Sequence, residues 1–152
     1  MTETDVARWR PVPRIRPIAI GIAFNGGRIL AMRVLDDAGA LTGVRPPGGA
    51  IEFGETAAAA VAREFKEEFG CAIEVEGAPL VLENLYEHHG ARGHEIVFAF
   101  RVRLLDDALY AAERLRVDEG DGNVCDVDWF DFARIRSGEV MLYPVGLAPL
   151  LP

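Results

Sequence analysis

Cysteine and long apolar runs are both scarce in this sequence. Its 152 residues include only two cysteines, Cys71 and Cys125, which are too few for a disulfide framework and lack the clustered spacing of a zinc site. Met1 to Arg16 mixes acidic residues with arginine and has no apolar stretch, so we expect neither a signal peptide nor a membrane span. These absences predict a reduced protein that stays in the cytoplasm.

Lysine and arginine are also few relative to the acidic residues. The chain has 16 lysines and arginines against 24 aspartates and glutamates, which gives a net charge of -8 and a pI near 4.9. A general affinity for nucleic acid polymers is not expected, because their phosphates favour dense basic patches. A small polyphosphate is a different ligand, since divalent cations between carboxylates and substrate oxygens reverse the local sign of charge.

Half of the residues are hydrophobic, which for a chain of this length predicts one domain over residues 1–152, with 1–15 as a peripheral segment. Apolar or alternating runs predict strands at 16–24, 28–33, 73–75, 79–85, 94–104 and 124–130. The first two strands are expected to form a hairpin through Asn25-Gly26-Gly27. We expect a mobile loop at 35–43, a connecting loop at 87–93 and a short helix at 131–137. Together these elements predict an α/β fold in which helices sandwich a mixed sheet.

The strongest helix signal covers Ala57 to Phe69. Thr56 is suited to cap the N-terminus of this helix, and Gly70 fits its stop position. Apolar residues that recur at intervals of three and four are expected to face the core: Ala58, Val61, Ala62, Phe65 and Phe69. The opposite side of the helix is therefore left to charged residues.

Three glutamates of this helix, Glu64, Glu67 and Glu68, stand three and four residues apart or adjacent on its charged side. Like charges at three- and four-residue spacings destabilise a bare helix by roughly 0.2–0.5 kcal/mol per pair, so we expect a cation to compensate. Mg²⁺ or Mn²⁺ suits carboxylate oxygens better than zinc or haem would. The alternative is a solvated helix face, which requires no glycines or paired charges at fixed offsets from the helix.

The segment before the helix carries such features. Arg45-Pro46-Pro47-Gly48-Gly49 has no helix potential, and its two glycines allow a backbone carbonyl to approach the same cation. Arg63 is placed to pair with Glu55 or Glu67 and to hold the carboxylates in position.

These residues match a long and specific pattern, the Nudix box, written G-x5-E-x7-R-E-U-x-E-E-x-G-U with U apolar. The matching positions are Gly49, Glu55, Arg63, Glu64, Phe65, Glu67, Glu68 and Gly70. The chain thus resembles the Nudix hydrolase family, with Cys71 at the final position where the family usually has Ile, Leu or Val. The box spans only Gly49 to Cys71, but the order of strands resembles the Nudix α/β/α sandwich over nearly the whole chain.

The resemblance implies a hydrolase that cleaves a diphosphate linkage in a nucleoside diphosphate derivative or a nucleoside triphosphate. It implies Mg²⁺ or Mn²⁺ on Glu64, Glu67 and Glu68, with the Gly48 carbonyl as a further ligand and Arg63 in the same catalytic set. Water attacks phosphorus, and Glu64 is one candidate for the base. In many relatives a glutamate from a downstream loop completes the site. Glu119 is the best match, although an acidic surface turn explains that segment about as well.

Three further residues, Arg45, Tyr86 and Arg92, are expected to contact substrate. Residues 83–93 fall where Nudix relatives often line the pocket, so Tyr86 is suited to stack on a base and Arg92 to meet phosphate. Tyr86 also stands at about the distance past the box at which a tyrosine marks diadenosine polyphosphate hydrolases. An edge-strand or core tyrosine is the alternative. The proline that marks many ADP-ribose pyrophosphatases is missing at the similar offset, which disfavours that substrate without excluding it.

Two other functions are open on the sequence. A catalytically silent Nudix-fold module that binds a nucleotide would be expected to lose one or more box glutamates, and this chain has them all. A purely structural acidic domain leaves the loop glycines and Arg63 unexplained. We also predict a homodimer, because small Nudix domains often pair and the apolar tail from Leu142 to Leu151 offers a surface for it.

Overall fold

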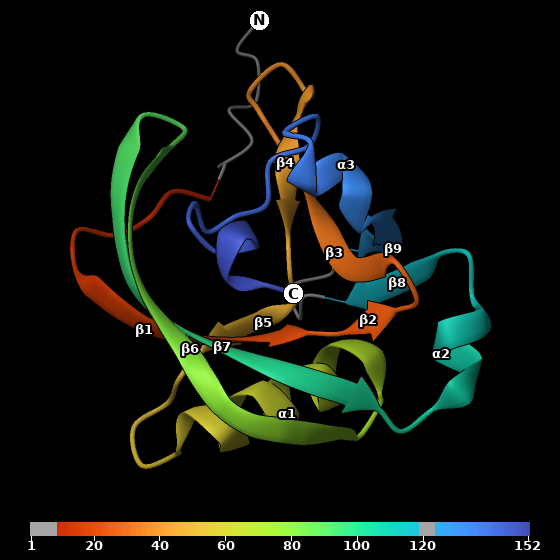
Figure 1. Cartoon of the computed structure of the whole chain (residues 1–152). Coiled ribbons are helices and arrows are strands. Elements are labelled where there is room, and N and C mark those ends of the chain that lie inside the picture. Colours follow the sequence, from red (N-terminus) through yellow and green to blue (C-terminus); the bar gives the residue numbers. More distant parts are fainter. Residues whose placement is uncertain (1–8, 119–123) are drawn as a thin grey trace, which may run out of the picture.

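The computed structural model describes residues 9–118 and 124–152 (Figure 1). Its elements follow the order β1 (Ile15–Ile22), β2 (Phe24–Asn25), β3 (Arg28–Leu35), β4 (Leu41–Arg45), β5 (Gly48–Ala50), α1 (Ala57–Phe69), β6 (Ile73–His88), β7 (Ala91–Leu104), α2 (Asp107–Ala111), β8 (Leu115–Asp118), β9 (Val124–Asp131), α3 (Phe132–Arg136) and the 3₁₀ turn η1 (Ala148–Leu150). Within those two ranges, none of the helices has the length and apolar character needed to cross a membrane.

Two sheets form the framework. Sheet A has the strand order β5-β1-β7-β6, and it is mixed because β1 runs parallel to β7 while its other pairs are antiparallel. Sheet B is antiparallel, with the order β2-β3-β9-β8 and with β4 also paired to β3. Helix α1 lies along sheet A, and the β6–β7 hairpin curls away from it (Figure 1). The predicted α/β fold with a mixed sheet is therefore confirmed.

Alternate residues of β1 enter two different cores. Ala19 packs with Phe65 of α1 in one buried cluster. Ile20 and Ile22 pack in a second cluster, which also contains Leu147 from the C-terminal tail. This division follows from the two-residue period of a strand. The second half of β1 is thus buried on both faces and lies between the two clusters.

Helix α1 begins and ends at the predicted residues. The Thr56 hydroxyl accepts a hydrogen bond from the N–H of Ala59 at 3.1 Å. Gly70 adopts a left-handed conformation with φ 63°, and its N–H donates to the Lys66 carbonyl. Val61 and Phe65 are fully buried as expected. Ala60, which the apolar pattern did not select, is also fully buried, whereas Ala62 is only half-buried.

The predicted hairpin at Asn25-Gly26-Gly27 is much shorter than expected. Only Phe24 and Asn25 of β2 pair with β3 across this turn, because β1 belongs to sheet A. The physical reason is the apolar character of β1 on both faces, which requires cover on two sides and is typical of a central strand. The chain therefore passes from one sheet to the other between β1 and β2.

Two predicted loops are partly strand. The 35–43 segment contains a turn fixed by Asp36, whose carboxylate accepts from the N–H groups of Ala38 and Ala40, and then enters β4. Residues 87–93 are the ends of β6 and β7, joined by a tight turn in which His89 and Gly90 have φ of 50° and 77°. These pairings satisfy the backbone without any local apolar run, so the sequence pattern missed them. It also missed β8 and α2.

The apolar C-terminal tail packs largely into its own chain. Leu142 and Leu147 are 2% and 0% exposed, and Leu142 bridges to Val44 of β4. Val145 and Leu150 remain exposed. Less of the tail is therefore available for subunit contact than its composition suggests, and the homodimer stays a prediction.

Candidate active site

Arg63 lies at the centre of a charged array that also comprises Glu55, before α1, and Glu64 and Glu67 on α1. Its Nε and Nη2 donate to the two carboxylate oxygens of Glu55 at 3.1 and 2.7 Å. Its Nη1 donates to Glu64 at 3.0 Å and to Glu67 at 3.4 Å, and Nη2 also donates to the Ala50 carbonyl at 3.0 Å. The sequence left open whether Arg63 pairs with Glu55 or Glu67, and in the structure it pairs with both.

The charges of this array are mutually stabilised. The hydrogen bonds from Arg63 hold the pKa of Glu55 below its usual range, with a smaller contribution from the N–H of Glu52. The same bonds, first to Glu55 and then to Glu64, raise the pKa of Arg63 well above its ordinary value, against the opposing effect of burial. Both groups are therefore ionised at neutral pH, and the guanidinium neutralises carboxylates that would otherwise repel one another.

Two glycines bring the backbone of β5 against this array. A Cβ at Gly49 would lie 2.5 Å from the carboxylate carbon of Glu64, so only glycine lets that side chain rest on the strand. Gly48 has φ +153°, and a Cβ there would meet the Ala19 carbonyl oxygen at 2.1 Å. The contact with Gly49 positions the Glu64 side chain, of which 15% is exposed, and the expected approach of a backbone carbonyl to a cation stays a prediction.

The donors suit a hard cation, but they do not form a ready-made cage. Among the residues that the structure describes, no three His, Cys, Asp or Glu side chains lie close enough together to hold an ion. Glu64 and Glu67 instead contact Arg63, and one carboxylate oxygen of Glu68 is buried. The three carboxylates thus provide oxygen donors on one side of α1 without the convergence that the spacing predicted.

The other predicted site residues fall in different places. Arg45 ends β4, four residues before Gly49. Tyr86 pairs with Gly93 across the β6–β7 hairpin, and its ring covers that glycine. Arg92 is adjacent to Gly93, so it faces the opposite side of the sheet. Tyr86 and Arg92 both line a cavity of about 610 Å³ beside residues 12–15, although their side chains lie on opposite faces of the sheet. Glu119 lies outside the described residues.

Tyr86 belongs to a group of polar side chains on the face of sheet A opposite α1. This inner polar cluster comprises Arg16, Asn84, Tyr86 and Glu95 of sheet A together with Arg45 of β4, which belongs to sheet B. Asn84 donates to Glu95 at 3.0 Å, and Arg16 lies 4.0 Å from the same carboxylate. Burial raises the pKa of Tyr86 and Glu95 adds to this, while Arg16 and Arg45 act in the opposite direction. Glu95 of β7 therefore contacts side chains from both neighbouring strands, β1 and β6.

The sequence pattern does not reveal Arg16, Asn84 and Glu95 as neighbours, because they come from three different strands. A signal was present in β6, where polar residues occupy alternate positions from Asn84 through Tyr86 to His88. That alternation indicates a polar face, but only the strand register shows which residues of β1 and β7 lie beside it.

A family model described as NUDIX domain matches residues 14–145. A NUDIX hydrolase from Nitrosomonas europaea is similar in structure, with TM-score 0.56 and 18% identity over 90% of this chain and 85% of that one. The E. coli ORF135 protein gives TM-score 0.55 and 18% identity over 90% and 86%. A UDP-X diphosphatase gives 0.51 and 18% over 86% and 56%. These likenesses support the fold, and the family model spans most of the sequence. The chain therefore belongs to the NUDIX family and is a hydrolase that acts on pyrophosphate bonds.

Proposed function

We propose that this protein uses Mg²⁺ or Mn²⁺ to cleave the diphosphate linkage of a nucleoside diphosphate derivative or a nucleoside triphosphate. The observation that carries the proposal is the set of carboxylates that Arg63 gathers beside β5, with Glu55, Glu64 and Glu67 all bonded to one guanidinium. A solvated helix face would require neither these hydrogen bonds from Arg63 nor the contact between Glu64 and Gly49.

The cation would be held by Glu64, Glu67 and Glu68 together with the Gly48 carbonyl. When bound, it supplies positive charge to the diphosphate oxygens, on which negative charge grows as the linkage breaks. Arg63 orients Glu64 and Glu67 toward the same side of α1. Glu64 is also our candidate for the group that takes the proton from the attacking water, because its carboxylate is held in place and only slightly exposed. Glu119 is a second candidate.

The inner polar cluster is the proposed place for the nucleoside part of the substrate. Tyr86 offers a half-buried aromatic ring, and Arg45 offers a cation close enough to influence both Tyr86 and His88. Arg45 is joined to the glycines of β5 by two prolines, so a ligand that extends along this segment passes from the cluster toward Glu64. Arg92 faces the other side of the sheet from this cluster. Dinucleoside polyphosphates and ADP-ribose are alternative substrates.

A turnover assay tests the proposal directly. The protein is incubated with nucleoside triphosphates, nucleoside diphosphate sugars, dinucleoside polyphosphates and ADP-ribose, each with Mg²⁺, with Mn²⁺ and with excess chelator, and released monophosphate or phosphate is measured. We expect cation-dependent release that rises toward alkaline pH, where water is more readily deprotonated. Full activity in chelator would contradict the cation dependence. Absence of turnover across the whole panel would favour a nucleotide-binding module instead.

The same proposal includes a cytoplasmic, single-domain homodimer. The low number of cysteines, two in 152 residues, supports the cytoplasmic location. The exposed side chains of Val145 and Leu150 support a contact between two copies of the chain. Light scattering at micromolar protein measures the mass, and a monomer would remove the dimer from the proposal.

A further inference from the structure

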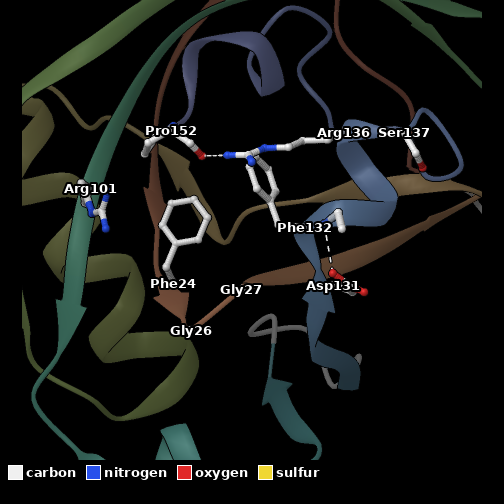
Figure 2. Close-up of a pocket in the computed structure, with 10 residues that line it drawn as sticks. Phe24, Gly26, Gly27, Arg101, Asp131, Phe132, Arg136, Ser137 and Pro152 are labelled. Carbon is white, nitrogen blue, oxygen red and sulfur yellow. Dashed lines mark hydrogen bonds between the residues drawn. The ribbon is translucent and has the colours of Figure 1, made fainter.

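A cavity of about 680 Å³ lies between the β2–β3 turn, β7 and α3. We call it the α3 cavity. Figure 2 shows its walls, which include Phe24, Arg101, Asp131, Phe132 and Arg136. None of these residues belongs to the charged array of α1 or to the inner polar cluster, so the proposed hydrolase function does not account for them.

The α3 cavity is well separated from the inner polar cluster. In the register between β1 and β7, Arg16 pairs with Glu95 and Ile22 pairs with Arg101. Six residues of strand span roughly 20 Å. The sheet surface between these two points is occupied by buried residues such as Ile20 and Ala99. A ligand in the α3 cavity would therefore not contact Tyr86.

Two arginines of the cavity are each placed over an aromatic ring. The guanidinium carbon of Arg101 lies 5.0 Å from the centroid of Phe24, and that of Arg136 lies 4.8 Å from the centroid of Phe132. The two rings meet edge to face at 5.4 Å. Cation–π contacts of this kind fix the position of a guanidinium without neutralising its charge. The cavity thus has two positioned cations on different walls (Figure 2).

The guanidinium groups retain donors for an anion. Arg136 donates through Nη2 to a main-chain oxygen of Pro152, the last residue described, so an oxygen acceptor inside the cavity is within its reach (Figure 2). A guanidinium has five N–H donors, so this bond leaves others. Arg101 lies 3.8 Å from Glu76, but both side chains are about half exposed and such a pair is weak. The carboxylate of Asp131 caps α3 through the N–H of Ala133.

We propose that the α3 cavity binds a nucleoside monophosphate, with the phosphate between Arg101 and Arg136 and the base against the half-buried ring of Phe24. Guanidinium forks match the oxygens of a phosphate, and an aromatic wall suits a planar base. The cavity volume falls within the roughly 300–1,000 Å³ of small-molecule sites. This site is independent of the proposed catalytic cation, because no carboxylate of α1 takes part in it.

Calorimetric titration with AMP in excess chelator tests the site, using inorganic phosphate and adenosine as separate arms. We expect AMP to bind more tightly than either fragment. Arg101→Gln and Arg136→Gln should each weaken AMP on the order of tenfold, as expected for losing a hydrogen bond to a charged group. Arg134→Gln is the matched control, because Arg134 is also exposed on α3 but is paired with Glu139 and does not line the cavity. It should leave binding unchanged.

Three outcomes would overturn the site. AMP affinity that is unchanged in the folded double variant, as judged by its melting temperature, would show that the arginines do not bind it. Affinity lost in Arg45→Gln but kept in Arg101→Gln would assign the ligand to the inner polar cluster. If inorganic phosphate bound as tightly as AMP, the ring of Phe24 would contribute nothing to binding. If the glutamine double variant does not fold, Arg101→Lys with Arg136→Lys replaces it, and we expect a smaller loss because charge remains while the forks are gone.

Discussion

The charges around Arg63 and the charges of the inner polar cluster are assembled in different ways. The acidic partners of Arg63 lie between Glu52 and Glu67, within one loop and one helix. The inner polar cluster draws on β1, β4, β6 and β7, and Arg16 and Glu95 meet only through strand pairing. One arrangement follows from local spacing, whereas the other requires the whole sheet.

This contrast suggests a division of work. The array near Arg63 holds groups suited to phosphorus chemistry, which needs carboxylates and a cation at fixed positions. The inner polar cluster holds groups suited to recognising the remainder of the substrate. We therefore expect changes in the array to lower turnover and changes in the cluster to alter substrate affinity.

The largest effect is expected from Glu68→Gln. Removing one charge of the proposed cation site should lower kcat by roughly two to four orders of magnitude. The cation-free protein should melt at the same temperature or slightly higher, because repulsion between neighbouring carboxylates on α1 is relieved. Glu139→Gln is the control, since Glu139 is paired with Arg134 away from α1. Glu119→Gln should have a smaller or equal effect. A Glu68→Gln protein with near-normal turnover would refute the proposed site.

The next effect in size is expected from Gly49→Ala. The new methyl group would lie 2.5 Å from the Glu64 carboxylate and must displace it. A displacement of about 1 Å can cost on the order of a hundredfold in rate, so we expect kcat to fall by roughly ten- to a hundredfold. Gly27→Ala is the matched control, because a Cβ at Gly27 meets no atom within 4 Å. Equal turnover in both variants would show that the position of Glu64 is unimportant.

The same contrast explains how far sequence reasoning reached. The caps of α1 and the pairing of Arg63 with Glu55 and Glu67 depend on residues near one another in the chain, and both are confirmed. The long hairpin expected between β1 and β3 was wrong because partner choice depends on which faces need cover. Asn84 and Glu95 were missed because strand register is not encoded in a local pattern.

A moderate effect on affinity is expected from Arg45→Gln. Loss of a cation beside Tyr86 should raise KM by roughly five- to tenfold while kcat changes little, as for an interaction made equally in the ground and transition states. Arg92→Gln is the matched control, since Arg92 faces the opposite side of the hairpin and should change KM by less than about twofold. If Arg92→Gln has the larger effect on KM, the substrate binds on the outer face of sheet A.

The smallest effect concerns His88, at the end of the inner face of β6. Burial lowers its pKa, and His89 and Arg45 lower it further, while Asp37 opposes them. The unfolded chain therefore takes up a proton at this residue before the folded chain does. Stability is complete above the ordinary histidine pKa of about 6.5, and it should decline as pH falls from that value through the lower folded pKa.

The variant His88→Asn should remove part of this decline. Because His88 is partly exposed, it should contribute less than about 1 kcal/mol to the loss of stability. The melting temperatures of the variant and the original protein are therefore compared directly between pH 7.5 and 5.5. A shallower fall in the variant is the expected result. Parallel curves would show that folding does not lower the pKa of His88 and would contradict the prediction. A steeper fall in the variant would reverse the sign of the effect and place Asp37 as the stronger neighbour of His88.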